Sequence, residues 1–155
     1  MNTATALVTP DTSERTIESA LLGLLAVPET QVFAFERGLL GFPEAREFAL
    51  VPARREGMFW LQSADFEALT FLLVDPFQFV PDYSVELGES ELGSTTPPAQ
   101  EDLLLLVIIT LPRTPEAPAT ANLQGPLALN LRDRLGRQVI LADSPWGVRH
   151  PIQLT

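Results

Sequence analysis

The sequence contains no cysteine and no lysine, and it has a single histidine, His150. Without cysteine there can be no disulfide framework, no thiolate nucleophile and no cysteine-ligated zinc site. One histidine among scattered carboxylates does not have the ligand spacing of a metal centre. The sequence therefore predicts a protein that holds neither a metal nor a cofactor, and the missing cysteine agrees with a reducing cytoplasm.

Long hydrophobic runs are also missing. The longest strongly apolar stretch, Leu103 to Leu111, is far shorter than the roughly 20 residues that span a bilayer. The N-terminus carries no cationic region ahead of its first apolar run, so we expect no signal peptide. Both absences predict a cytoplasmic protein that does not enter a membrane.

Basic residues are scarce. Ten arginines stand against 20 aspartates and glutamates, which gives a formal net charge of −10. Between Asp75 and Pro112 there are seven acidic residues and no basic one. Such a surface repels phosphate backbones, which argues against direct binding of DNA or RNA. It would attract a basic protein partner, although acidity can also serve only to keep a protein soluble.

Material for a core is abundant, but it is divided into short pieces. Hydrophobic residues make up 46% of the 155 residues, and 14 prolines and 9 glycines interrupt them. A chain of this length is expected to form one domain that buries roughly 70% of its unfolded surface. Roughly eight to ten short strands without a βαβ rhythm predict an antiparallel all-β fold, either a small barrel or a sandwich.

We expect the rest of the chain to be arranged around residues 60–83. Residues 69–74 form an apolar run, which predicts a strand that is covered on both faces. Asp75 and Pro76 suit the N-cap and the first position of a short helical turn. Three aromatic residues follow, and the sequence leaves open whether they close the core or form an exposed edge for a partner: Phe77, Phe79 and Tyr83.

The N-terminal region permits two structures. Asp11 and Glu14 resemble a capping box, and apolar residues follow at helical spacing, which favours a helix over residues 14–26. A glycine within this segment weakens the helix. The alternative is a strand over about residues 19–27 that turns at Pro28.

Other strands follow from short apolar runs between turn residues. In the last third, Leu127, Leu129 and Leu131 alternate with small or polar residues, which predicts a strand with one buried face. Gly136 would then supply the positive φ of a bulged hairpin. Further strands are expected at residues 31–36, 48–52, 58–62, 84–87, 103–111 and 138–141, with a mobile acidic loop at 88–100.

Two groups of residues could carry catalysis, but each has a simpler explanation. Asp143, Ser144 and His150 contain the residue types of a catalytic triad, yet no nucleophile-elbow motif surrounds the serine. Asp65 and Glu67 could share a face as a glycosidase carboxylate pair, but carboxylates in a polar connection are usually solvated. We therefore expect no enzymatic activity, and binding is the better class of function.

A glycine-rich segment, residues 38–44, could in principle cradle a phosphate group. It lacks both the Lys-Ser/Thr pair of a P-loop and the G-x-G-x-x-G pattern of a dinucleotide site. We interpret it as a tight turn that leads into a short helical turn at Pro43.

Several motifs occur in the order and spacing of one known family. They are Gly38–Glu44, Phe59–Ser63, Phe71–Tyr83, Ala121–Leu123 with Pro126 and Asn130, Gly136–Gln138 and Arg149–Pro151. Together they resemble the flagellar assembly factor FliW. The resemblance extends from about residue 20 to residue 153.

The resemblance implies a mainly β fold: a single antiparallel β-barrel-like domain with a few short helical turns. It places a first strand near residues 23–27 and a second at 32–35, against the local helical pattern. It divides the chain into a flexible N-terminal extension, residues 1–18, and a FliW-like domain, residues 19–155.

The resemblance also implies a function without catalysis. FliW-like proteins bind flagellin in the cytoplasm and, when free of flagellin, bind and antagonise the translational repressor CsrA. A monomer is expected when no partner is bound. The residues carried forward as candidate partner contacts are Asp75, Phe77, Phe79, Asp82, Tyr83, Glu86, Asn122, Asn130 and Arg149. A β-barrel that binds a small molecule without catalysis is the alternative.

Overall fold

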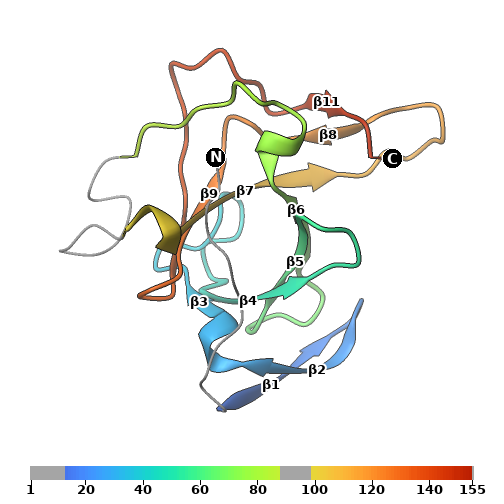
Figure 1. Cartoon of the computed structure of the whole chain (residues 1–155). Coiled ribbons are helices and arrows are strands. Elements are labelled where there is room, and N and C mark those ends of the chain that lie inside the picture. The colour runs from blue at the N-terminus through green and yellow to red at the C-terminus, as the bar shows by residue number, and fades with distance from the viewer. Residues whose placement is uncertain (1–12, 88–98, 155) are drawn as a thin grey trace.

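The computed structural model describes residues 13–87 and 99–154, and they form a closed β-barrel of seven strands (Figure 1). Around the barrel the strand order is β9-β7-β6-β5-β4-β3-β10 and back to β9. These strands span β3 Val32–Ala34, β4 Glu47–Pro52, β5 Met58–Ser63, β6 Thr70–Val74, β7 Leu103–Thr110, β9 Leu127–Asn130 and β10 Leu135–Gln138. The predicted barrel-like, mainly β fold is confirmed.

One seam of the barrel differs from the rest. β10 runs parallel to β3 and pairs with it only at Leu135 and Ala34, whereas the other paired strands are antiparallel. At the opposite side, β7 pairs with β9 through its first half and with β6 through its second half. The long strand β7 therefore closes the barrel by spanning two neighbours.

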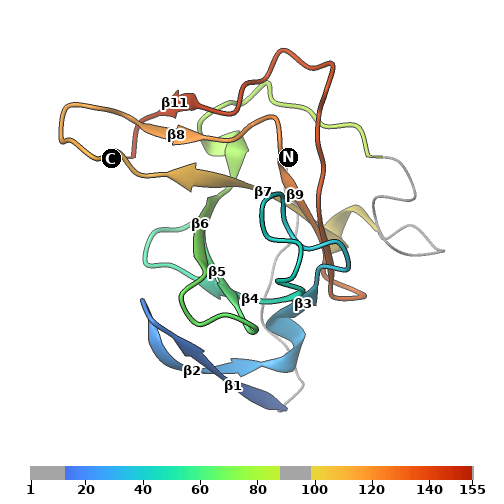
Figure 2. The same cartoon turned by 180° about the vertical axis from the view of Figure 1, so that it is seen from behind.

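A separate two-stranded sheet and a two-strand extension of the barrel sheet cover the outside of the barrel (Figures 1 and 2). The hairpin of β1 Glu14–Ser19 and β2 Gly23–Pro28 lies against β3 and β4. On the far side, β8 Ala119–Ala121 extends from β7, and β11 His150–Ile152 pairs with β8. The only helices in the described residues are single 3-10 turns: η1 Glu29–Gln31, η2 Pro76–Gln78 and η4 Gln100–Asp102.

The barrel interior is filled by side chains from β3, β4, β5, β6, β7 and β9 and from the loop after β3. Its buried residues include Phe33, Phe35, Phe48, Leu50, Leu61, Leu73, Leu104, Leu106, Leu127 and Leu129. Phe35 and Phe48 meet edge to face, with ring centroids 5.2 Å apart. The interior is therefore a packed core.

β7 has two buried faces, as its unbroken apolar sequence predicts. Leu104 and Leu106 point into the barrel, and Leu105, Val107 and Ile109 belong to a second core beneath β8 and β11. β9 has the same arrangement, because Ala128 lies in the second core and all four of its residues are buried. The predicted one-sided strand at residues 127–131 is therefore wrong, since the C-terminal segment covers its outer face.

The N-terminal hairpin overturns the local helical pattern. Residues 14–26, where spacing favoured a helix, form β1 and the start of β2, and Ile17 pairs with Leu25 across the hairpin. Ile17 and Val27 pack on the outer face of the barrel. β1 begins at Glu14, so residues 14–18 of the predicted extension 1–18 belong to this sheet; residues 1–12 lie outside the described residues.

An arginine fixes this hairpin to the barrel. The Nε and Nη2 atoms of Arg15 donate to the two carboxylate oxygens of Glu29 at 2.8 and 3.1 Å. Its Nη1 atom donates to Glu47 of β4 at 3.1 Å. At the other end of the hairpin, the backbone N–H of Ala20 donates to the carbonyl of Glu67 at 2.8 Å. Both ends of the hairpin are thus attached.

Three predicted details near the C-terminal half are wrong. Residues 84–87 are not a strand, and the strand expected at 138–141 lies instead at 135–138. The positive φ of the β9–β10 turn belongs to Arg134, at 56°, and not to Gly136. The loop predicted at 88–100 lies outside the described residues except for its last two positions.

Glycine is needed at position 136 because of a close packing contact and not because of a positive φ. A Cβ atom there would lie well inside van der Waals contact with the buried ring of Phe35. We expect Gly136→Ala to lower the free energy of unfolding by about 1–3 kcal/mol, because overpacking forces neighbours off their positions. Urea denaturation measures this change, and Gly147→Ala is the matched control because Gly147 has open space around it. Equal stability of the two variants would contradict the close approach.

Candidate partner-binding site

The turn after β6 is built as predicted. Asp75 caps η2: its Oδ1 atom accepts a hydrogen bond from the backbone N–H of Phe77 at 2.9 Å. Pro76 occupies the first helical position, where its missing N–H costs nothing. The Asp75 carboxylate is therefore used in a local cap.

Tyr83 belongs to the second core. It is only 3% exposed, and its hydroxyl donates to the carbonyl of Leu123 at 2.6 Å. Its ring contacts Trp146 edge to face at 5.2 Å and Phe77 at 6.0 Å. Burial raises the pKa of the Tyr83 phenol above its usual range. The aromatic residues at this turn thus fasten the C-terminal segment to the barrel, and Tyr83 offers almost no surface to a partner.

Phe77 and Phe79 lie at the border of that core. Both are partly buried and pack against the second core cluster. The guanidinium carbon of Arg55 lies 5.8 Å from the centroid of the Phe79 ring, which places the cation of the β4–β5 turn over this aromatic face. Both rings therefore take part in packing within the protein and are only partly available to a partner.

The remaining candidates divide into exposed residues and turn formers. Asp82, Glu86 and Arg149 are exposed. Asn122 shapes a turn, because its Oδ1 atom accepts from the backbone N–H groups of Gln124 and Gly125 at 3.2 and 2.9 Å.

Asn130 is 2% exposed and forms the β9–β10 turn. Its amide donates to the Asp133 carboxylate, and its Oδ1 atom accepts from the Asp133 backbone N–H, each at 3.1 Å. The nine predicted residues therefore do not come together as one surface patch.

Asp65, one of the carboxylates considered for catalysis, has a structural role. The Oδ2 atom of Asp65 accepts from the backbone N–H groups of Arg46 and Glu47 at 2.9 and 3.1 Å, joining two loops.

Within the described residues, no three histidine, aspartate or glutamate side chains form a group that could hold a metal ion. No helix among these residues has the length and apolar character to cross a bilayer.

Two residues of the motif at 59–63, Gln62 and Ser63, hold the loop that follows β5 in place. Gln62 is fully buried; its amide donates to the carbonyls of Ser63, Phe66 and Glu67, and its Oε1 accepts from the hydroxyl of Thr70. The Oγ atom of Ser63 accepts from the backbone N–H groups of Asp65 and Phe66 at 3.0 and 2.9 Å. These bonds fix the β5–β6 loop and hold Phe66 at the surface.

Exposed apolar side chains gather at one end of the barrel. The β3–β4, β5–β6 and β7–β8 loops project from this end because successive strands are antiparallel. Ala20 bonds to Glu67, so the tip of the β1–β2 hairpin reaches the same end. We call this surface the apolar rim: Leu21, Leu24, Leu40, Phe42, Phe66, Leu111 and Ile140.

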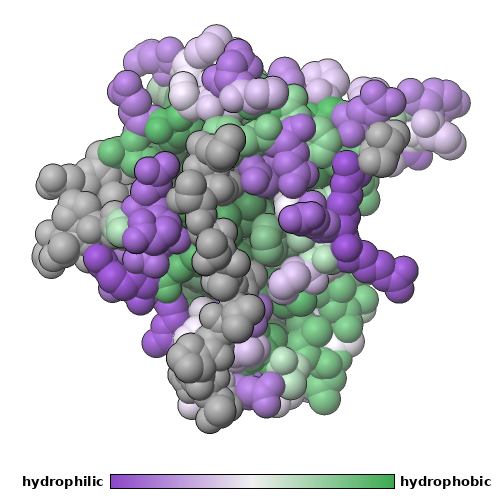
Figure 3. Space-filling model, viewed as in Figure 1, coloured by the Kyte–Doolittle hydropathy of each residue, from purple (hydrophilic) through white to green (hydrophobic). Residues whose placement is uncertain are grey.

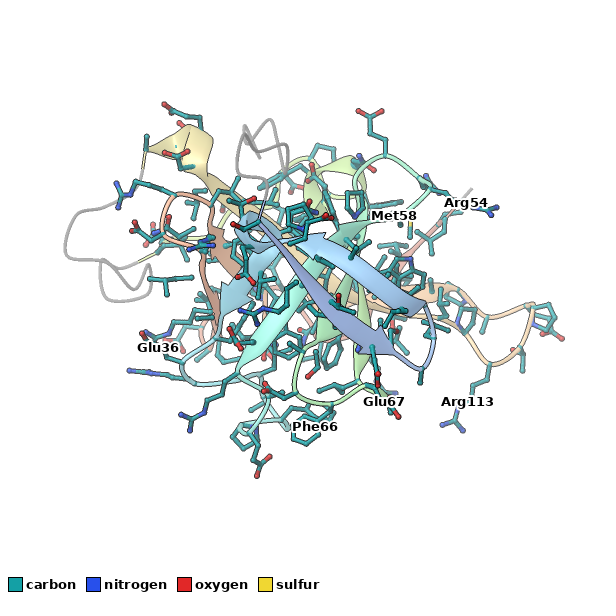
Figure 4. The ribbon with its side chains drawn as sticks, turned by 90° about the horizontal axis from the view of Figure 1, so that it is seen from below. Glu36, Arg54, Met58, Phe66, Glu67 and Arg113 are labelled. Carbon is teal, nitrogen blue, oxygen red and sulfur yellow. The ribbon has the colours of Figure 1, made fainter. Side chains whose placement is uncertain are left out.

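The figures locate this rim. Figure 3 shows an apolar patch over the turn of the β1–β2 hairpin, where Leu24 is 72% exposed. In Figure 4, Phe66, Glu67, Glu36 and Arg113 lie towards one end of the barrel, and Arg54 and Met58 lie towards the other. Of the large exposed hydrophobic residues that the structure describes, only Val148 is not part of the rim.

A cavity of about 730 Å³ adjoins the rim. Its walls are the loop after β3, β10 and residues 139–140, including Leu39, Leu40, Gln138 and Ile140. Sequence reasoning missed this cavity, because its two walls lie about 100 positions apart in the chain. Both walls contain family motifs, Gly38–Glu44 and Gly136–Gln138, but nothing in the sequence indicated that these two motifs meet.

The turn at residues 39–42 has a defined backbone geometry. Leu39 and Phe42 exchange backbone hydrogen bonds, and Gly41 between them has a φ of +89°, as a type II turn requires. Leu39 is buried and anchors the turn, whereas Leu40 at its tip is 75% exposed. Gly38 has a φ of +62° and no room for a Cβ beside Pro43. The predicted tight turn is confirmed, and it presents one leucine to solvent.

Comparison with known proteins gives a consistent result. A family model described as "FliW protein" matches residues 16–152. Similar relatives named "Flagellar assembly factor FliW" include one from Treponema denticola, 35% identical over 88% of this chain and 92% of its own. Another, from Geobacillus kaustophilus, is 37% identical over 83% of this chain and 88% of its own. A crystal structure of the flagellar assembly factor FliW superposes with a TM-score of 0.80 at 32% identity, covering 91% of this chain and 99% of that chain.

Proposed function

The chain belongs to the FliW family, and from that premise we propose that it binds flagellin as a chaperone-like partner in the cytoplasm. When free of flagellin, it binds a CsrA-type translational repressor and antagonises it, so that flagellin mRNA is translated. The role in flagellar assembly follows from family membership; the two partners are our proposal. The observation that carries it is the family match over nearly the whole chain.

The apolar rim supports the flagellin half of this proposal. Monomeric soluble proteins rarely leave many large apolar side chains exposed together at one end, and such clusters mark interaction surfaces. A flagellin segment that is helical in the filament has an apolar face to bury before assembly. Leu24 in β2, and Leu40 and Phe66 on loops, offer matching contacts.

The negative net charge of the chain supports the proposed binding of the CsrA-type repressor. A protein that binds RNA must present cations to the phosphate backbone. A chain with a net charge of −10 attracts such a protein at long range and does not itself attract nucleic acid. Protein binding is also favoured over a ligand held inside the barrel, because side chains such as Phe33 and Phe48 fill that interior.

Binding experiments with purified proteins test the proposal. We expect the free protein to be a monomer that binds the cognate flagellin monomer and, separately, the cognate CsrA protein. Adding flagellin to the CsrA complex should release CsrA, as measured by size-exclusion chromatography and calorimetry. The association rate with CsrA should fall as salt rises, because its steering is electrostatic. If neither protein binds at physiological salt, the proposal is overturned.

A further inference from the structure

We propose that the cavity between the loop after β3 and strand β10 binds a peptide segment in which an apolar side chain lies next to a carboxylate. The segment belongs to the flagellin partner and not to the repressor, so this inference rests on the proposed function. It adds to that function a specific site and the chemistry of its ligand.

Hydrogen bonds of Gln138 hold the walls of the cavity together. The backbone N–H of Leu40 donates to Oε1 of Gln138 at 2.8 Å, and Nε2 of the same glutamine donates to the carbonyl of Gly125 at 3.1 Å. Gln138 therefore ties the tip of the turn to β10 and to the loop before β9. A peptide that enters this cavity finds a preformed surface, which lowers the entropy that binding costs.

One side of the cavity is apolar and continuous with the rim. Leu40 and Ile140 both line the cavity and are 75% and 53% exposed. Phe42, at the end of the same turn, is partly exposed and meets the Phe71 ring edge to face at 5.5 Å. An apolar side chain of a peptide would bury Leu40 and Ile140 together.

The other side of the cavity is cationic in an otherwise acidic protein. Two of the ten arginines, Arg37 and Arg137, line it, and Arg37 is exposed. Among the described residues that line the cavity, Glu36 supplies the one carboxylate. Arginine presents a planar fork of donors that matches the two oxygens of a carboxylate. A ligand with a carboxylate complements this cavity.

The same charge argues against the repressor as the occupant. A protein that is basic enough to hold RNA would bring cations towards the exposed Arg37, and like charges placed together disfavour a complex. The acidic surface elsewhere on the chain suits that partner better. Flagellin binding and repressor binding should therefore respond differently to a charge change at this cavity.

Two substitutions in the full-length protein test the site. Arg37→Glu reverses the charge of an exposed residue at the cavity, and Leu40→Asp places a carboxylate on its apolar side. We expect each to weaken binding of the cognate flagellin monomer at least tenfold and to leave CsrA binding within about threefold. Matched controls are Arg54→Glu, which lies towards the other end of the barrel, and Val148→Asp, outside the rim. Both controls should leave flagellin binding within about twofold.

A charge exchange adds a second test. Aspartates and glutamates in the terminal segments of flagellin are changed to arginine one at a time, and each variant is titrated with both the wild-type protein and Arg37→Glu. One such flagellin variant should bind Arg37→Glu more tightly than it binds the wild-type protein. Thermal melts establish that every variant is folded.

The outcomes separate this inference from the function on which it rests. If wild-type protein binds flagellin and Arg37→Glu and Leu40→Asp bind it equally well, the cavity is not the site and the proposed function stands. If the two variants weaken CsrA binding but not flagellin binding, the assignment of the occupant is wrong. If wild-type protein does not bind flagellin, the proposed function and this inference both fail.

Discussion

Replacing Phe48 by alanine is expected to lower the free energy of unfolding by about 3–5 kcal/mol, the usual cost of deleting a buried aromatic ring. Phe48 is fully buried in the middle of the barrel, where it contacts the rings of Phe35 and Phe71. Its removal leaves a cavity that the closed barrel cannot fill by collapsing, because strands on every side are hydrogen bonded to two neighbours.

Urea denaturation, followed by the fluorescence of Trp60 and Trp146, measures this loss. Phe66→Ala is the matched control, because the same ring is removed from a side chain that is 47% exposed. It should change stability by no more than about 0.5 kcal/mol. A small effect of Phe48→Ala would mean that the barrel interior is not the main core.

Tyr83→Ala is expected to be as damaging as Phe48→Ala, with a loss of about 3–5 kcal/mol. The ring lies between Phe77 and Trp146 in the second core, and its hydroxyl satisfies the carbonyl of Leu123. Tyr83→Phe keeps the ring but leaves that carbonyl without its donor, so we expect a loss of about 1–2 kcal/mol. Asp82→Arg, on the exposed neighbour, should leave stability nearly unchanged.

The pH dependence of the wild-type protein provides an independent readout of Tyr83. Burial raises the pKa of its phenol above the ordinary value of about 10, so the folded state holds the proton more tightly than the unfolded state. Stability contributed by the neutral phenol is therefore complete below pH 10 and is lost as the pH rises above it. Tyr83 is the only tyrosine, and the chain has neither lysine nor cysteine, so between about pH 10 and 12 no other side chain obscures this titration. The Tyr83→Phe variant should lose the alkaline decline; an identical decline would contradict the burial.

Most strands were predictable because their patterns are local. The apolar run at residues 69–74 and the cap at Asp75 specify a buried strand and the turn after it without reference to the rest of the chain. The hairpin at residues 14–28 was not predictable from local spacing. Its apolar residues fit a helix equally well, and the choice depends on the outer face of β3 and β4, where Val32 and Ala49 receive it.

The candidate site was harder to predict than the fold. Asn130 and Tyr83 have the residue types of partner contacts, but their side chains are used inside the protein, and only the tertiary structure decides this. Gly136 illustrates the same limit, since its constraint comes from the ring of Phe35 and not from its own backbone angle. The cavity joins a loop after β3 to β10, and no sequence pattern links segments so far apart.

The parallel seam between β3 and β10 also has a consequence for synthesis on the ribosome. Strands β3 to β6 emerge early as an antiparallel meander, but β3 keeps an unpaired edge until residues 135–138 have been made. Unpaired edges recruit other chains, so the nascent protein passes through a stage that is open to aggregation. The cavity obtains its second wall at the same moment, because β10 supplies it. A chain released before β10 therefore has neither a closed barrel nor this cavity, and the ability to bind through it arises only with completed folding.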